Sequence, residues 1–205
     1  MELLEAIRTR RSAKQFADTP VPKGLIEQVL EAGLWAPSGQ NLQPARFWVI
    51  TDRKVLGELQ SALYEYGLKL KKFLPILRLF VARFKGEKGP RVFRSLRPTL
   101  FNGAPALVLT GADTGSSTTY AKDCTLAAMN LMLAAHGLGL GSCYFGWVTL
   151  LNRLSGWKKR LDIPSEVEIV DGIGLGYPSG ERQAPPRKSV AEVTTWIGES
   201  AGRTV

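Results

Sequence analysis

A short N-terminal stretch, residues 8–14, concentrates side chains that bind anions. Within seven residues it holds four cations and two hydroxyls, namely Arg8, Thr9, Arg10, Arg11, Ser12 and Lys14. Hydrogen bonds from Arg and Lys to an anion are roughly twice as strong as neutral ones, and a guanidinium group fits phosphate oxygens in pairs. The stretch therefore predicts a site for a small anion, most simply a phosphate, and the alternative is a solvated basic turn.

A second polar stretch, residues 36–44, has the sequence APSGQNLQP and leads directly into the apolar run 47–50. Prolines at both of its ends keep it out of a helix. Its amide and hydroxyl groups suit recognition of the polar edge of a ring, and the alternative is a plain surface loop.

The net charge of +9 is unevenly distributed over the 205 residues. Residues 69–97 contain ten basic residues and one acidic residue, which leaves 17 of each sign in the rest of the chain. This basic segment, together with the residues from about 64, is predicted to be an inserted helical region or lid with its charges facing solvent. Docking of an acidic protein, or contact with an anionic membrane surface, is the alternative.

The chain offers little for other kinds of active site. Cys124 and Cys143 are the only cysteines, so a four-cysteine zinc or iron–sulfur site cannot be built within one chain, and we expect no metal. His136 is the only histidine and is interpreted as structural, near a helix end where a cation is mildly favoured. The glycine runs 137–141 and 172–176 do not match GxGxxG, and no GxxxxGK[ST] or GxSxG motif occurs.

Apolar periodicity and turn residues predict one domain without a linker. Helices are expected over 2–9, 23–35, 53–70, 118–136, 150–161 and 190–197, and strands over 47–50, 106–110 and 167–175. Thr51 or Asp52 is expected to cap the third of these helices. Small residues in 118–136 suit a central or inter-subunit helix. No apolar run of about 18 residues and no leader pattern is seen, so a cytoplasmic protein without a membrane span is expected.

Five pieces in this order resemble the FMN-dependent nitroreductase family. They are RTRRSAKQF (8–16), APSGQNLQPARF (36–47), FNGAPALVL (101–109) with DCTLAAMNLMLAAHGLGLGSCYFG (123–146), GIGLGYP (172–178) and PPRKS (185–189). The resemblance implies a three-layer α+β fold in which helices flank a mixed central sheet. It also implies a homodimer with two FMN molecules at the subunit interface.

The resemblance further implies which residues bind the cofactor. It assigns Arg10, Arg11, Ser12 and Arg187 to the phosphate, Lys14 to the pyrimidine edge, Pro37, Ser38 and Asn41 to a loop supplied by the partner subunit, and Tyr144, Phe145 and Gly146 to the backbone near flavin N5. Many relatives carry a lysine two positions before the last phosphate arginine. Here Pro185 occupies that position, and Lys188 is the candidate replacement.

The implied activity is a ping-pong hydride transfer from NADH or NADPH, through flavin N5, to an electron-poor acceptor such as a nitroaromatic, a quinone or an activated alkene. The flavin carries the chemistry, so no protein catalytic residue is expected. One alternative is a flavoprotein reduced by an acidic ferredoxin or flavodoxin that docks on the basic segment. Another is a non-catalytic basic binding module, although no nucleic-acid-binding fold is recognisable.

Overall fold

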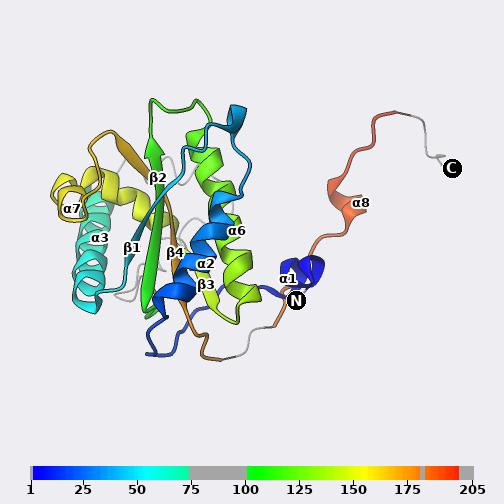
Figure 1. Cartoon of the computed structure of the whole chain (residues 1–205), viewed down its shortest axis with the longest axis horizontal. Coiled ribbons are helices and arrows are strands. Elements are labelled where there is room, and N and C mark those ends of the chain that lie inside the picture. The colour runs from blue at the N-terminus through cyan, green and yellow to red at the C-terminus, as the bar shows by residue number, and fades with distance from the viewer. Residues whose placement is uncertain (1, 74–100, 181–182, 199–205) are drawn as a thin grey trace.

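The computed structural model describes residues 2–73, 101–180 and 183–198, which form a three-layer α+β fold. A central sheet lies between a layer containing α3 (Arg53–Phe73) and α7 (Ser155–Arg160) and a layer containing α2 (Lys23–Leu34) and α6 (Tyr120–Gly137) (Figure 1). Most of the basic segment, from residue 74 on, lies outside the described residues. Its prediction as a helical insertion or lid therefore stays a prediction.

The sheet comprises β1 (Arg46–Ile50), β2 (Ala106–Asp113), β3 (Gly141–Tyr144) and β4 (Val167–Gly176), in the order β1-β2-β4-β3. All three strand pairs are antiparallel. The resemblance implied a mixed sheet, and the parallel pairing in the described part of the chain is a single bridge between Ser12 and Ser142, at the outer side of β3.

Two apolar cores lie on the two faces of the sheet, because the side chains of β2 alternate between them. Leu107 and Leu109 face the core formed with α3, whereas Val108 faces the core formed with α2 and α6. The buried run predicted for 106–110 is thus apolar on both faces, as is typical of a strand covered by helices on each side.

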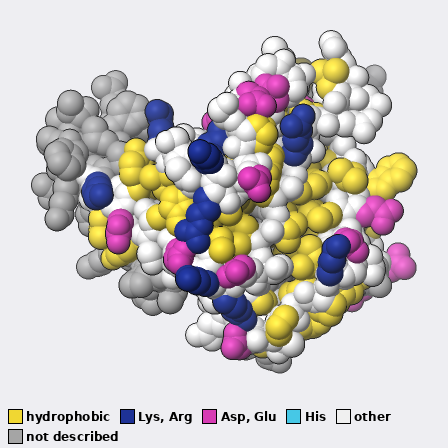
Figure 2. Space-filling model, turned by 60° about the vertical axis from the view of Figure 1, so that its left-hand side comes forward, with side chains coloured by type: hydrophobic (Ala, Val, Ile, Leu, Met, Phe, Trp, Pro, Cys, Tyr) yellow, Lys and Arg dark blue, Asp and Glu magenta, His cyan; other side chains and the backbone are white. Residues whose placement is uncertain are grey.

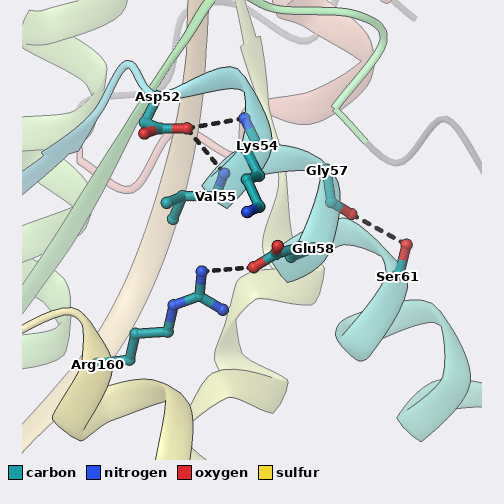
Figure 3. A network of polar contacts seen from close by, with 7 residues as sticks. All are labelled: Asp52, Lys54, Val55, Gly57, Glu58, Ser61 and Arg160. Carbon is teal, nitrogen blue, oxygen red and sulfur yellow. Dashed lines mark hydrogen bonds and ion pairs between the residues drawn. The ribbon is translucent and has the colours of Figure 1, made fainter.

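The start of α3 shows how local sequence sets an element boundary. Asp52 Oδ1 accepts hydrogen bonds from the backbone N–H groups of Lys54 and Val55, at 2.8 and 3.0 Å, which confirms Asp52 rather than Thr51 as the cap (Figure 3). One turn further on, Glu58 pairs with Arg160, so α3 and α7 are also joined by an ion pair.

Two predicted helices are shorter than expected. The prediction of one helix over 150–161 was wrong, because the chain forms a 3₁₀ helix, η2 (Gly146–Arg153), and then α7, with non-helical backbone at Leu154 (φ −113°, ψ 71°) between them. The helix over 190–197 ends at Val193, as α8 (Val190–Val193), since Thr194 is extended. Ser189 and Glu192 form a capping box at its start.

Exposed apolar residues mark the N-terminal helix and the C-terminal segment. In α1 (Leu3–Thr9) the predicted apolar face of Leu3, Leu4 and Ile7 is exposed, and Ala6 alone in that helix is buried. Residues 183–198 extend away from the three layers (Figure 1), and Trp196 is 84% exposed.

The charges of the described residues are mixed. The face shown in Figure 2 carries basic and acidic side chains beside one another, with apolar surface between them. Among the helices that the structure describes, none is long and apolar enough to cross a membrane.

A row of glycines on β4 gives one face of the sheet room for the chain that follows β3. A Cβ atom on Gly172 would lie 2.5 Å from Val148, and one on Gly174 would lie 2.6 Å from Phe145. Real Cβ atoms do not approach carbon this closely, so only glycine lets these two side chains pack onto the strand. The glycine run 172–176 therefore has a packing role.

We predict that Gly174→Ala lowers the free energy of unfolding by about 1–3 kcal/mol, because the new methyl group overpacks the site of Phe145. Urea denaturation measures this change, and Phe145→Leu in the same chain should restore part of it. Gly57→Ala is the matched control, since open space surrounds that helical position and alanine should stabilise it by about 0.5–1 kcal/mol. Equal effects of the two glycine substitutions would contradict the packing argument.

Candidate functional site

The N-terminal cations lie beside β3 because the backbone after them pairs with the sheet. Ala13 N–H donates to Ser142 O at 2.9 Å, and Ala17 N–H donates to Tyr177 O at 2.8 Å. Phe16 forms an antiparallel bridge with Pro178. The residues predicted to hold an anion, Arg10, Arg11, Ser12 and Lys14, are thereby fixed at the edge of the sheet, and we call them the cationic cluster.

The guanidinium groups of this cluster contain buried nitrogens with no acceptor. Arg11 Nη1 donates to the carbonyl oxygens of Arg8 and Arg10, at 2.6 and 2.8 Å. In contrast, Arg10 Nε, Arg10 Nη1 and Arg11 Nε are buried and have no hydrogen-bond partner in the described part of the chain. Buried donors are normally satisfied, so these three nitrogens indicate a place for an acceptor of negative charge.

Lys14 lies further along the same edge. Its Nζ is 3.8 Å from the Sγ atom of the buried Cys143, and Asn102 Nδ2 is 3.5 Å from the same sulfur. Asn102 also donates to Ala13 O at 3.3 Å. It belongs to the FNGAP sequence but was not predicted as a site residue, because nothing in the sequence shows that its amide reaches residue 13.

His136, near the end of α6, contacts the residue before the cationic cluster. The hydroxyl of Thr9 donates to Glu5 O at 2.7 Å, so its contact of 2.8 Å with His136 Nε2 requires the imidazole to be the donor. Burial lowers the pKa of His136, and the positive charges of Arg10 and Arg11 lower it further. At this helix end, where a cation was expected to be favoured, the pKa of His136 is therefore lowered, mainly by burial and further by the two arginines.

The segment Tyr144–Gly146 continues from Cys143 at the end of β3. Phe145 is buried and packs edge to face on Phe101, with ring centroids 5.5 Å apart, while Gly146 is exposed. Tyr144 Oη donates to Asp171 Oδ1 at 2.5 Å. Burial and this hydrogen bond raise the pKa of Tyr144 to about 12, so its hydroxyl stays protonated.

Asp171, which accepts the hydrogen bond of Tyr144, was not predicted from the sequence. Its buried carboxylate also accepts from Thr125 at 3.1 Å and from Thr110 at 3.4 Å. The nearby thiol of Cys124 is fully buried, and burial is the main cause that raises its pKa to about 12. Cys124 is therefore an unreactive thiol.

The loop 36–44 lies at the other end of α6. Asp123, in the first turn of that helix, is buried and accepts from Gly39 N–H at 3.3 Å and from Thr119 Oγ1 at 3.1 Å. Ser38 Oγ accepts from Gln43 N–H at 2.9 Å. Pro37 and Asn41 are exposed, and Asn41 has a φ of 57°.

The structure thus groups some predicted site residues and separates others. Ser12 pairs with Ser142, and Lys14 contacts Cys143, the next residue of β3. The segment 144–146 follows directly, so it lies near Lys14. The loop residues Pro37, Ser38 and Asn41 lie elsewhere on the same chain. Arg187 and Lys188 are exposed, and in the described residues no hydrogen bond or ion pair joins either of them to Arg10.

Comparison with known proteins relates this chain to flavin enzymes. A Methanothermobacter thermautotrophicus protein, provisionally named NADH dehydrogenase/NAD(P)H nitroreductase, is 30% identical over 87% of this chain and 78% of its own length. A nitroreductase from Bacteroides fragilis, solved with bound FMN, is 24% identical and superimposes with a TM-score of 0.76 over 97% of this chain and all of that one.

A third relative, from Desulfovibrio desulfuricans, is provisionally described as a nitroreductase and was solved in complex with FMN. It is 26% identical, with a TM-score of 0.67 over 97% of this chain and 98% of that one. The model of the Nitroreductase family matches residues 7–177, a range that includes the cationic cluster, the loop 36–44 and all four strands. This chain therefore belongs to the Nitroreductase family.

Proposed function

We propose that this chain is an FMN-dependent oxidoreductase that passes a hydride from NADH or NADPH to an electron-poor acceptor such as a nitroaromatic, a quinone or an activated alkene. The observation that carries the proposal is the set of three buried guanidinium nitrogens that have no acceptor among the described residues. Two relatives of similar fold hold FMN, and the name of another gives NAD(P)H as the donor.

The cationic cluster fits the phosphate of FMN. A buried donor without a partner costs about 1–3 kcal/mol, and more when it is charged, so the cluster gains stability from an anion with several acceptor oxygens. Arg10, Arg11 and the hydroxyl of Ser12 are the groups that would hold the phosphate. The flavin ring would be held by Lys14, which contacts Cys143 of β3, and by the backbone of the next three residues, Tyr144, Phe145 and Gly146.

FMN, when bound, supplies the redox chemistry by taking up a hydride and passing it on. The residues of this chain would bind FMN, orient its ring and place a positive charge beside it. Lys14 would lie at the pyrimidine edge, where a cation stabilises the negative charge that reduction adds. No side chain is needed as a general base, and donor and acceptor would use the same exposed side of the ring in turn, which makes the cycle ping-pong.

The separation between the loop 36–44 and the cationic cluster favours a homodimer. Asp123 holds the loop and His136 lies beside the arginines, so the two are thirteen residues apart on α6, or about 20 Å. One small cofactor cannot easily contact both within one chain. A second copy would therefore supply Pro37, Ser38 and Asn41 to the FMN held by the first.

Exposed apolar side chains on α1, at the end of α2, in the loop 36–44, on α6 and in the segment 183–198 support this assembly. They are Leu3, Leu4, Ile7, Leu34, Trp35, Leu42, Leu126, Val190, Val193, Trp196 and Ile197. Trp35 is 81% exposed and Ile197 is 95% exposed, which is unusual for large apolar residues unless another surface covers them. In the proposed dimer the segment 183–198 would pack on the partner, and Arg187 and Lys188 would complete a phosphate site.

Two alternative functions were predicted from the sequence, a basic binding module and a flavoprotein reduced by an acidic redox protein. Membership of the Nitroreductase family argues against a non-catalytic basic binding module. Reduction by an acidic ferredoxin or flavodoxin depends on the basic segment, most of which lies outside the described residues. It remains a hypothesis, and a steep loss of such reduction with salt would support it.

We predict that the purified protein shows flavin absorbance that bleaches when NADPH or NADH is added without oxygen, and that returns when a nitroaromatic or a quinone is then added. Anaerobic absorbance spectroscopy measures both halves of this cycle. Flavin bands that persist with both nucleotides would contradict the nicotinamide half of the proposal. A protein that takes up no FMN would contradict the whole.

We predict that Arg10→Ala weakens FMN binding by about 10-fold to 100-fold, because it removes charge-assisted hydrogen bonds to the phosphate. Quenching of FMN fluorescence measures the dissociation constant. Lys159→Ala is the matched control, since Lys159 is an exposed cation on α7, in the layer opposite α2 and α6, and its loss should leave the constant unchanged. Equal dissociation constants for both variants would contradict the placement of the phosphate.

We predict that FMN binding raises the pKa of His136. Burial and the charges of Arg10 and Arg11 hold that pKa below 6.5, and a phosphate on the arginines would offset their charge. By linkage, this residue makes binding tighter as the pH falls through the range in which the imidazole takes up its proton. His136 is the only histidine, so one imidazole NMR signal reports its titration with and without FMN.

His136→Gln controls for titration of the FMN phosphate itself, because the glutamine amide can still donate to Thr9 but carries no charge at any pH. The difference between the two proteins in the pH dependence of the FMN dissociation constant gives the contribution of His136. An unchanged imidazole pKa on FMN binding would place the anion elsewhere.

A further inference from the structure

Asn102, which the proposed function leaves without a role, joins three parts of the chain. It belongs to the short connection before β2, and its amide Nδ2 donates to the carbonyl oxygen of Ala13 at 3.3 Å. The same Nδ2 lies 3.5 Å from Sγ of Cys143, on β3. One half-buried amide thus links this connection, the N-terminal stretch and the sheet.

The backbone at Asn102 suits few residue types. Its φ is 55°, and Gly103 after it has a φ of 75°, so two successive residues are left-handed. Asparagine is one of the few residues other than glycine that adopt this conformation readily. Left-handed residues with a side chain are often found at functional sites. The chain therefore places asparagine, and not glycine, where an amide group can reach Ala13.

The hydrogen bond to Ala13 fixes the peptide unit from which Lys14 starts. The atoms of a peptide unit lie in one plane, so the carbonyl oxygen of Ala13 and the N–H of Lys14 turn together. Ala13 is 6% exposed, and its own N–H donates to Ser142 O at 2.9 Å. The direction in which the Lys14 side chain leaves the backbone is therefore set by β3 on one side and by Asn102 on the other.

The charged end of Lys14 lies against the sulfur that Asn102 also contacts. Lys14 Nζ is 3.8 Å from Cys143 Sγ, and Asn102 Nδ2 is 3.5 Å from the same atom. Lys14 is otherwise an exposed residue, and an exposed lysine has much rotamer freedom to lose. Among the described residues no carboxylate forms an ion pair with it, so its charge is available to a ligand.

We propose that Asn102 is a positioning residue that holds Lys14 toward the pyrimidine edge of the flavin and so favours the binding of reduced FMN over oxidised FMN. The inference rests on the proposed function, which puts the lysine charge at that edge. Reduction adds negative charge to the ring, and a cation stabilises this charge only from close by, because the Coulomb energy falls with distance. A lysine that swings freely into solvent loses part of the effect.

This role predicts a larger effect on one redox state of the cofactor than on the other. The oxidised ring carries no charge, and the phosphate bound by the arginines of the cationic cluster is the same in both states. Loss of the Asn102 amide should therefore weaken the binding of reduced FMN more than the binding of oxidised FMN. A residue that only stabilised the fold would weaken both to the same extent.

The test measures the dissociation constant of oxidised FMN by fluorescence quenching and the midpoint potential of the bound flavin by anaerobic titration against a reference dye. Together they give the ratio of the dissociation constants of oxidised and reduced FMN, with no turnover of nicotinamide or acceptor. Asn102→Gly is the variant, because glycine adopts a φ of 55° without strain and removes only the amide side chain. Urea denaturation checks that the variant folds.

We expect Asn102→Gly to lower this ratio by about threefold to tenfold, where tenfold equals about 30 mV for a two-electron couple. Lys14→Gln should lower the ratio at least as much, since it removes the charge itself. The double variant should equal Lys14→Gln, because Asn102 acts only through the lysine.

Asp162→Gly is the matched control. Asp162 has a φ of 52°, and its carbonyl oxygen accepts from Trp48 of β1, at the opposite edge of the sheet from β3. Glycine relieves a left-handed residue there as it does at Asn102, but far from Lys14, so the ratio should stay at the value of the unaltered protein.

An unchanged ratio in Asn102→Gly, together with a lowered ratio in Lys14→Gln, would overturn the inference alone. A double variant that falls below Lys14→Gln by the full effect of Asn102→Gly would also overturn it, because the asparagine would then act without the lysine. An unaltered protein that binds no FMN, or an unchanged ratio in Lys14→Gln, would instead overturn the placement of the flavin in the proposed function.

Discussion

The site depends on backbone hydrogen bonds that attach residues 12–17 to the edge of the sheet. The bonds from Ala13 to Ser142 and from Ala17 to Tyr177 hold a stretch whose side chains would otherwise be a solvated basic turn. Beside this attachment, Arg10 Nε, Arg10 Nη1 and Arg11 Nε are buried. The charge of the cluster is local in sequence, but its burial and its position beside β3 come from strand pairing.

The glycine row on β4 makes room for the chain that leaves the same edge of the sheet. Gly172 and Gly174 give Val148 and Phe145 room to pack, so the chain after Tyr144 can turn across the sheet and leave Gly146 exposed. On the opposite face of β4, Ile173 and Leu175 pack in the core under α6. One strand thus combines a close-packed apolar face with a face that has no side chains at alternate positions.

The sequence predicted the features that are local. Apolar spacing located α2, and Asp52 was a candidate cap because its side chain reaches only two and three residues ahead. The break at Leu154 and the early end of α8 were missed, because apolar spacing does not show at which residue the backbone leaves the helical conformation. Asp171 carried no sequence signal, because its partners come from three elements distant in sequence. The likeness to a known family supplied the cofactor and its residues, which spacing alone left open.

The way in which α6 contacts two parts of the site, one at each end, has a consequence for pairs of defective mutants. This helix holds the loop 36–44 at its first turn through Asp123, and at its last turn His136 contacts Thr9, the residue before the cationic cluster. In the proposed dimer, each copy then gives its loop to one cofactor and its arginines to the other. Two defective chains, one altered in the loop and one in the arginines, would form a mixed dimer with one intact site and one doubly damaged site. If the proposed dimer forms, intragenic complementation that restores at most half of the normal sites would follow from the two ends of this helix.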